Sequence, residues 1–170
     1  MVEYSSDKTL PMFYNELDTS NLRYVIYARK STVDEQRQQR SIPDQIRDCQ
    51  KLAAQLQLHV IGPAFTEKKS AKKPNQRPVF RQILNDIKAG KYDGIIAWHP
   101  DRLARNMLEG GEIIHMVDTE EIKDLKFCMH HFTQDANGKM LLGMAFVLSK
   151  QYTDHLSESV ERGVKNRFRE

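Results

Sequence analysis

One serine hydroxyl stands among cationic side chains, directly after an apolar run near the start of the sequence. Ser31 follows Arg29 and Lys30, which come after the β-branched and aromatic residues of segment 24–28. A serine is a poor nucleophile near neutral pH unless a neighbouring group helps its hydroxyl lose a proton. No histidine lies near Ser31 in the sequence, and no order of serine, histidine and aspartate suggests a triad. Nearby positive charge can instead favour the alkoxide form.

Further arginines occur in two other polar segments, and they indicate phosphate chemistry. Arg77 ends a basic stretch, and segment 99–106 contains Asp101, Arg102 and Arg105. A guanidinium is planar, permanently charged and able to bind two oxygens at once, so a group of them can hold a phosphodiester and stabilise the charge of phosphoryl transfer. The Asp101 carboxyl group can handle a proton on a leaving oxygen.

The elements that must position these residues alternate between strand and helix. Runs rich in β-forming and apolar residues predict strands at 23–28, 58–62, 94–98 and 125–129, with helical patterns between them. The run at 94–98 is apolar almost throughout, as in a strand covered on both faces. We therefore predict an α/β fold with a mainly parallel, four- to five-stranded sheet flanked by helices.

Capping signals predict where the helices begin. Ser41 with Asp44, and Asn106 with Glu109, have the spacing of helix N-caps, and the second helix is predicted from Pro78 to Gly90. A long helix is expected from about Gly138 towards the end of the chain. Gln45 lies one position off the apolar face of its helix, so the pattern alone predicts an exposed side chain.

The predicted topology brings the chemically interesting residues together. Ligands of parallel sheets bind beyond the carboxyl ends of the strands. Three segments follow such strand ends, and they contribute Arg29, Ser31, Arg77, Asp101, Arg102 and Arg105. The amino ends of the strands offer no comparable set. A phosphate site at the carboxyl edge is therefore predicted.

Each of these residues also has a structural or regulatory explanation. A serine after a strand often serves as a turn or cap residue, and the RKST segment also fits an exposed kinase acceptor site. Asp101 and Arg102 also fit a surface ion pair. His99, His130 and His131 suggest a metal, but no third ligand stands at a familiar spacing. The gathering of the segments favours the catalytic interpretation.

Composition limits the classes of protein to which the chain can belong. With 170 residues, 39% of them hydrophobic and 29% charged, it has the size and balance of one globular domain. Cys49 and Cys128 form neither a disulfide framework nor a metal pattern, and Cys49 fits the core. The sequence shows no signal peptide, and its longest apolar run, 140–148, is too short to span a bilayer. We expect a cytoplasmic protein without a membrane partner.

Positive charge is concentrated in segment 66–81, which carries six cations and one anion. Such a segment suits contact with phosphates, although a solvated loop has the same composition.

Five motifs follow one another along the chain. They are YARKST, SIPDQIRDC, NQRPVF, WHPDRLARN and ANGKMLLGMAFVLSKQYTDHLSESVERGVK. In this order they resemble the catalytic domain of serine recombinases, the resolvase and invertase group, and most closely the large serine recombinases and transposases. The resemblance covers about residues 22–168. It implies an enzyme that attacks a DNA phosphodiester with a serine, leaves a 5′-phosphoserine linkage and a free 3′-hydroxyl, and religates without metal, nucleotide or other cofactor.

The resemblance also implies roles for individual residues. Ser31 would be the nucleophile, Gln45 would help to position the phosphate, and Asp101 would be the acid for the leaving 3′-oxygen. The arginines expected to bind and activate the scissile phosphate are Arg29, Arg77, Arg102 and Arg105. The residues expected to contact DNA are Ser70, which matches a serine often seen in this active site, and Lys72, Lys73, Arg162, Lys165, Arg167 and Arg169.

The final helix suggests the partners. Segment 139–152 is apolar nearly all round, which fits either packing in the core or self-association. The resemblance implies double-stranded DNA as substrate and dimers that become tetramers in the active complex. We divide the chain into an extension at 1–22, a catalytic domain at 23–137 and an oligomerisation and DNA-approach helix at 138–170. The sequence contains no helix-turn-helix and no four-cysteine zinc pattern, so we expect a fragment of a longer recombinase.

Two other functions remain open from the sequence. A DNA-binding or assembly module could keep this fold without the chemistry, which the basic segments favour. A small-molecule phosphotransferase would need a glycine-rich phosphate loop after a strand, and none is present in the sequence.

Overall fold

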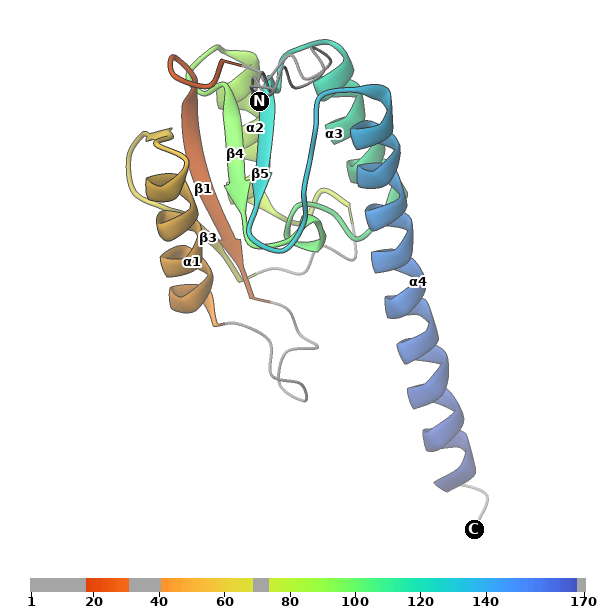
Figure 1. Cartoon of the computed structure of the whole chain (residues 1–170). Helices are drawn as coiled ribbons and strands as arrows, with labels where there is room; N and C mark the ends of the chain where they lie inside the picture. Colours follow the sequence, from red (N-terminus) through yellow and green to blue (C-terminus); the bar gives the residue numbers. More distant parts are fainter. Residues whose placement is uncertain (1–17, 31–40, 69–73, 168–170) are drawn as a thin grey trace, which may run out of the picture.

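The computed structural model describes residues 18–30, 41–68 and 74–167, with the backbone alone for residues 152–154 and 156–167. Within these residues five strands form one parallel sheet (Figure 1). The strands are β1 (Arg23–Arg29), β2 (His59–Val60), β3 (Phe65–Glu67), β4 (Gly94–Ala97) and β5 (Asp124–Phe127). Their order is β2-β1-β4-β5, and β3 also pairs with β1. The predicted α/β fold with a parallel sheet is confirmed.

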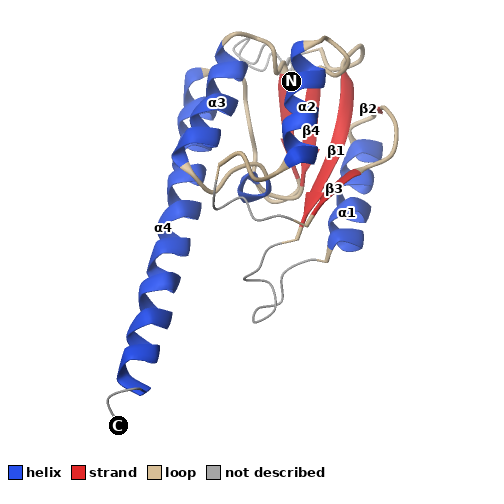
Figure 2. Ribbon diagram, turned by 180° about the vertical axis from the view of Figure 1, so that it is seen from behind, coloured by secondary structure: helices blue, strands red, loops and turns tan. Residues whose placement is uncertain are grey.

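Helices cover both faces of the sheet (Figure 2). They are α1 (Ile42–Gln55), α2 (Pro78–Lys88), α3 (Met107–Asp118) and α4 (Ala136–Arg167), with a short 3₁₀ helix, η1 (Pro100–Arg102), after β4. Side chains alternate along β1 because successive residues of a strand point to opposite faces. Tyr24 and Ile26 pack with Cys49 of α1, whereas Val25 and Tyr27 belong to the core formed with α2, α3 and α4.

Two of the predicted helix starts are confirmed by their caps. The Ser41 hydroxyl accepts a hydrogen bond from the Asp44 backbone N at 3.3 Å, and the Asn106 side-chain oxygen accepts one from the Glu109 backbone N at 2.9 Å. The last helix begins at Ala136, two residues before the predicted start. The side chain of Leu22, at the end of the predicted extension, packs in the core.

The predicted strand at 58–62 is shorter in the structure. Only His59 and Val60 pair with β1, and Gly62 then takes a left-handed backbone conformation with φ +69°. A second short strand, β3, pairs with the end of β1. The polar sequence of that segment gave no sign of it.

Helix α4 begins on the body of the protein and then extends away from the sheet (Figure 1). Its first turns pack against α3, with Leu142 and Phe146 buried in the core. No helix in the described parts of the chain is long and apolar enough to cross a membrane.

The amino edge of the sheet carries a charged network that the sequence did not predict. Asp93 accepts hydrogen bonds from the backbone N of Arg23 at 3.0 Å, from the Arg23 Nε at 2.8 Å and from the Lys123 Nζ at 2.8 Å. Beside it, the Tyr24 hydroxyl donates to the Asp124 carboxylate at 2.5 Å. These contacts join the starts of β1, β4 and β5, so their role is structural.

Replacing Asp93 with asparagine should destabilise the protein at neutral pH by about 1–3 kcal/mol, because charged hydrogen bonds are lost. The hydrogen bond from Arg23, with help from Lys123, outweighs burial and holds the Asp93 pKa well below its ordinary value of 3.8. A depressed carboxyl pKa stabilises the folded state above that ordinary value, and the contribution disappears as pH falls below it. Urea unfolding of both proteins at several pH values should show their difference shrinking below about pH 4. A difference that grows on acidification would contradict this assignment.

Candidate active site

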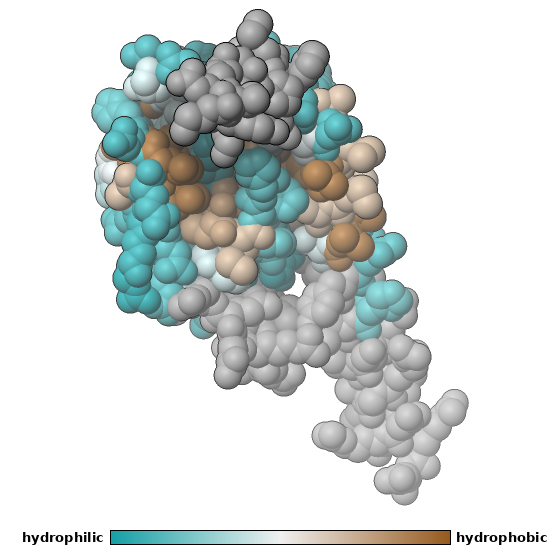
Figure 3. All heavy atoms as spheres, in the orientation of Figure 1, coloured by the Kyte–Doolittle hydropathy of each residue, from teal (hydrophilic) through white to brown (hydrophobic). Residues whose placement is uncertain are grey.

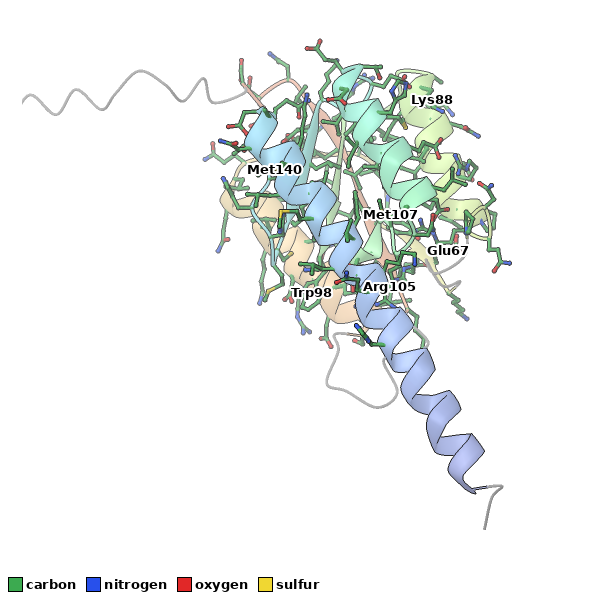
Figure 4. The ribbon with its side chains drawn as sticks, turned by 90° about the vertical axis from the view of Figure 1, so that its right-hand side faces the viewer. Glu67, Lys88, Trp98, Arg105, Met107 and Met140 are labelled. Atoms are coloured by element: carbon green, nitrogen blue, oxygen red, sulfur yellow. The ribbon has the colours of Figure 1, made fainter. Side chains whose placement is uncertain are left out.

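The carboxyl edge of the sheet gathers the arginines as predicted. The Arg29 Nη2 at the end of β1 donates to the Asp101 carbonyl at 3.0 Å. The Arg102 Nη1 donates to the Arg29 carbonyl at 3.1 Å, and the Arg77 Nη1 to the Arg102 carbonyl at 3.1 Å. Three segments that are distant in the sequence therefore meet, and Figure 4 shows this edge, with Arg105 and Trp98 labelled, beside α4.

Arg29 is completely buried at the centre of this group. Besides Asp101, its guanidinium donates to the carbonyls of Lys30 at 3.0 Å and of Arg102 at 3.3 Å. Burial, together with the positive charges of Arg105 and Arg102, lowers the pKa of Arg29 to about 9. The side chain therefore remains protonated at pH 7, but it does so in an unfavourable environment that a bound anion would relieve.

Gln45 is buried rather than exposed, so the prediction from helical periodicity was wrong. Its side chain is 0% exposed. The Gln45 Nε2 donates to the Arg29 carbonyl at 3.1 Å, and its Oε1 accepts from the Arg29 backbone N at 3.4 Å. The side-chain amide thus binds the last residue of β1 as the backbone of a neighbouring strand would. In this structure Gln45 fixes the position of Arg29.

Arg77 is buried against a carboxylate that sequence reasoning assigned only to helix capping. The Arg77 Nη2 lies 2.8 Å from the Glu109 Oε2, and Glu109 is 2% exposed. The same guanidinium donates to the Tyr27 hydroxyl at 3.2 Å and to the Leu103 carbonyl, and it stacks on the Phe80 ring with its Cζ 4.1 Å from the centroid. Glu109 therefore belongs to the site as the partner of Arg77.

Glu109 also joins two loops at this edge. Its Oε1 accepts from the Asn75 backbone N at 3.2 Å, and its Oε2 accepts from the Asn106 Nδ2 at 2.8 Å. In the sequence, the spacing of Asn106 and Glu109 was the only signal for a role of Glu109. That spacing predicted the helix cap, but it did not predict the ion pair with Arg77.

Asp101 is an ionised carboxylate at neutral pH in this arrangement. Its Oδ2 accepts from the Arg105 Nη2 at 3.1 Å, and its Oδ1 lies 3.3 Å from the Arg102 Nε. Burial would raise the Asp101 pKa, but His99, Arg102 and Arg105 together hold it well below its usual range. An ionised carboxylate must gain a proton before it can act as an acid.

Several predicted residues lie outside what the structure describes. Ser31, Ser70, Lys72, Lys73 and Arg169 fall in undescribed segments, and the side chains of Arg162, Lys165 and Arg167 are not described either. The described segment before Ser31 ends at Lys30, whose backbone N donates to the Glu67 carbonyl at 3.0 Å. The roles predicted for the undescribed residues stay predictions.

The described residues contain no group of three or more histidine, cysteine, aspartate or glutamate side chains arranged to hold a metal ion. The site that they do form is a set of buried cations with two carboxylates, Asp101 on η1 and Glu109 on α3. Such a set can bind a phosphate and stabilise charge on it.

An exposed apolar surface runs along the described part of α4. Figure 3 shows hydrophobic residues on this side of the molecule. The exposed large apolar side chains of the helix are Met140, Leu141, Met144, Val147 and Leu148. Single exposed apolar residues are normal, but a row along one helix is typical of a surface that binds another protein.

Comparison with known proteins gives one family and several similar structures. The family described as "Resolvase, N terminal domain" matches residues 24–170. The N-terminal catalytic domain of TP901-1 integrase is 23% identical, with 78% of this chain and 97% of that chain covered and a TM-score of 0.56. The C-terminal catalytic domain of ISC1926 TnpA, an IS607-like serine recombinase, is 19% identical, with 88% and 100% covered and a TM-score of 0.54. No curated protein gives a significant match. The two structures share the fold described above.

Proposed function

The chain belongs to the resolvase family, and we propose that it is the catalytic domain of a site-specific DNA recombinase. In this proposal Ser31 attacks a phosphodiester of double-stranded DNA and forms a 5′-phosphoserine linkage. The observation that carries it is the gathering of Arg29, Arg77, Arg102 and Arg105 at the end of β1, two residues before Ser31.

The arginines support phosphoryl transfer by their charge and their fixed positions. All four are buried, and hydrogen bonds to backbone carbonyls or carboxylates fix their guanidinium groups in place. Groups that are already oriented stabilise developing charge without reorganising during the reaction. A phosphate that enters this group replaces some of the protein acceptors and relieves the repulsion between the guanidiniums.

The proposed reaction conserves the phosphodiester bond energy. The Ser31 oxygen forms a bond to phosphorus while the bond from phosphorus to the 3′-oxygen breaks. The serine loses one proton and the 3′-oxygen gains one, so the step releases no net proton. Asp101 is ionised in the free protein, and we assign it the acceptance of a proton and its delivery to the leaving oxygen. Religation reverses these steps, and it requires no nucleotide.

The same proposal includes self-association through α4. Strand exchange needs more than one subunit, and the exposed apolar row on α4 suits a second copy of the chain. The basic residues towards the end of the helix, Arg162, Lys165, Arg167 and Arg169, are proposed to approach the DNA backbone together with Ser70, Lys72 and Lys73.

Replacing Ser31 with alanine should abolish covalent attachment to DNA. The wild-type chain is incubated with a library of nicked DNA duplexes of random sequence. Because of the nick, the short strand released by cleavage dissociates, and the linkage between protein and DNA is trapped. A denaturing gel should show a protein–DNA adduct for wild type and at least about a 1000-fold smaller amount for Ser31→Ala, because the attacking oxygen is missing.

The exposed Ser20 offers a matched control, and Ser20→Ala should form the adduct at the wild-type level. An adduct that persists in Ser31→Ala would refute the assignment of the nucleophile. Salt-sensitive binding of DNA by wild type without any adduct would support the assembly module instead.

A further inference from the structure

His99 contacts both the backbone and the carboxylate of Asp101. It is the last residue before η1, with extended backbone angles of φ −152° and ψ 153°, and its side chain is 34% exposed. The His99 Nδ1 lies 3.2 Å from the Asp101 backbone N, where it accepts a hydrogen bond. The same Nδ1 lies 3.1 Å from the Asp101 Oδ1.

These two contacts require different protonation states of one nitrogen. An Nδ1 without a proton accepts from the backbone N–H, whereas an Nδ1 with a proton donates to the carboxylate. The two hydrogen bonds therefore exclude each other. Imidazoles change between these states from about pH 5 to pH 8, the range in which most enzymes work.

The turn that His99 caps carries much of the candidate site. Besides the Asp101 carboxylate and the Arg102 guanidinium, η1 supplies the carbonyls of these two residues, to which Arg29 and Arg77 donate. A change at the start of η1 thus reaches three of the four arginines.

We propose that His99 is a positioning residue of this site, whose neutral imidazole caps η1 and whose protonated imidazole releases that cap and binds the Asp101 carboxylate. The inference rests on the proposed function and adds a residue and a pH dependence to it. In the protonated state His99 competes with Arg102 for the Asp101 Oδ1, which is 3.3 Å from the Arg102 Nε.

The charged neighbours of His99 are connected through one carboxylate. Asp101 contacts the imidazole, and Arg102 and Arg105 share the same carboxylate. Burial, together with the charges of His99 and His131, lowers the pKa of His130, which follows β5.

Two variants of His99 distinguish the loss of the cap on η1 from the uptake of a proton by the imidazole. Asparagine is a preferred N-cap residue whose side-chain oxygen accepts from a backbone N–H, but it takes up no proton in this range. Alanine supplies neither contact. For wild type, the initial rate of adduct formation at Ser31 should fall about fivefold from pH 8 to pH 5.5, the effect of losing one cap.

His99→Asn should keep the wild-type rate at pH 8 within about twofold and lose the decrease on acidification. His99→Ala should be about fivefold slower than wild type at pH 8 and equally insensitive to acid. His59→Asn, a change at an exposed histidine of β2, serves as the control and should behave as wild type. An unchanged pH dependence in His99→Asn would overturn the proposal while leaving the role of Ser31 intact.

A second measurement does not depend on activity. The ¹⁵N chemical shifts of the His99 ring in the folded wild-type chain distinguish a bare Nδ1 from a protonated one. At pH 8 the neutral ring should carry its proton on Nε2, and His99→Asn should lack the signal, which assigns it. A neutral ring with its proton on Nδ1 would overturn the proposal even if the chain forms no adduct with DNA.

Discussion

Replacing Glu109 with alanine should lower the free energy of unfolding by about 3–5 kcal/mol, the usual cost of breaking a buried ion pair. The Arg77 guanidinium is buried and bonded to Glu109 at 2.8 Å, so the variant leaves a buried positive charge without its carboxylate. The hydrogen bonds to Asn75 and Asn106 are lost as well. Urea unfolding followed by circular dichroism measures the difference.

Glu112 provides the matched control on the same helix. Its carboxylate pairs with Arg81 at 2.6 Å, but both side chains are partly exposed, so Glu112→Ala should cost at most about 1 kcal/mol. Removing both charges, with Arg77→Met and Glu109→Leu, should recover a large part of the stability lost in Glu109→Ala. Equal losses for Glu109→Ala and Glu112→Ala would show that burial does not govern this pair.

Replacing Phe146 with alanine should also cost about 3–5 kcal/mol, because it removes a large side chain from a closely packed position. Phe146 is 1% exposed and lies where α4 meets α3. A Cβ atom on Gly110 of α3 would come within 3.0 Å of the Phe146 ring, so the glycine allows the ring to approach the α3 backbone closely. The ring is a principal attachment of α4 to the body.

Met144 lies two residues earlier on α4 and is exposed, so Met144→Ala should change stability by less than about 0.5 kcal/mol in the monomer. Thermal unfolding of the two variants beside wild type makes the comparison. A loss below about 1 kcal/mol for Phe146→Ala would mean that α4 detaches without disturbing the core. The exposed apolar row would then belong to a helix that is free to move.

Much of the fold could be predicted because its signals are local. Hydrophobic runs identified β1, β4 and β5, and the caps at Ser41 and Asn106 identified the starts of α1 and α3. Parallel strands then require the polar segments after them to meet at one edge, so the sequence alone predicts that Arg29, Arg77 and Arg102 lie together.

The rest depends on contacts between distant segments. Gln45 looked exposed from helical periodicity, but the end of β1 needed hydrogen bonds that its amide supplies. Strand β3 is three residues long and contains Thr66 and Glu67, and only its pairing with β1 defines it. Neither feature has a pattern that a single sequence reveals.

The charges of the site show the same limit. The sequence indicated that Arg77 and Asp101 share an edge, but not that Arg77 binds Glu109 or that Asp101 contacts two arginines. Such pairings depend on side-chain directions within about an ångström, and residue spacing does not specify them.

The use of backbone carbonyls to hold the arginines has an electrostatic consequence. A carbonyl dipole solvates a guanidinium without cancelling its charge. Arg29 is the clearest case, because its completely buried guanidinium donates to the carbonyls of Lys30, Asp101 and Arg102, and these contacts leave its positive charge in place. Its field reaches approaching polyanions over about one Debye length, roughly 8 Å at physiological ionic strength, so raising the salt concentration should slow their capture.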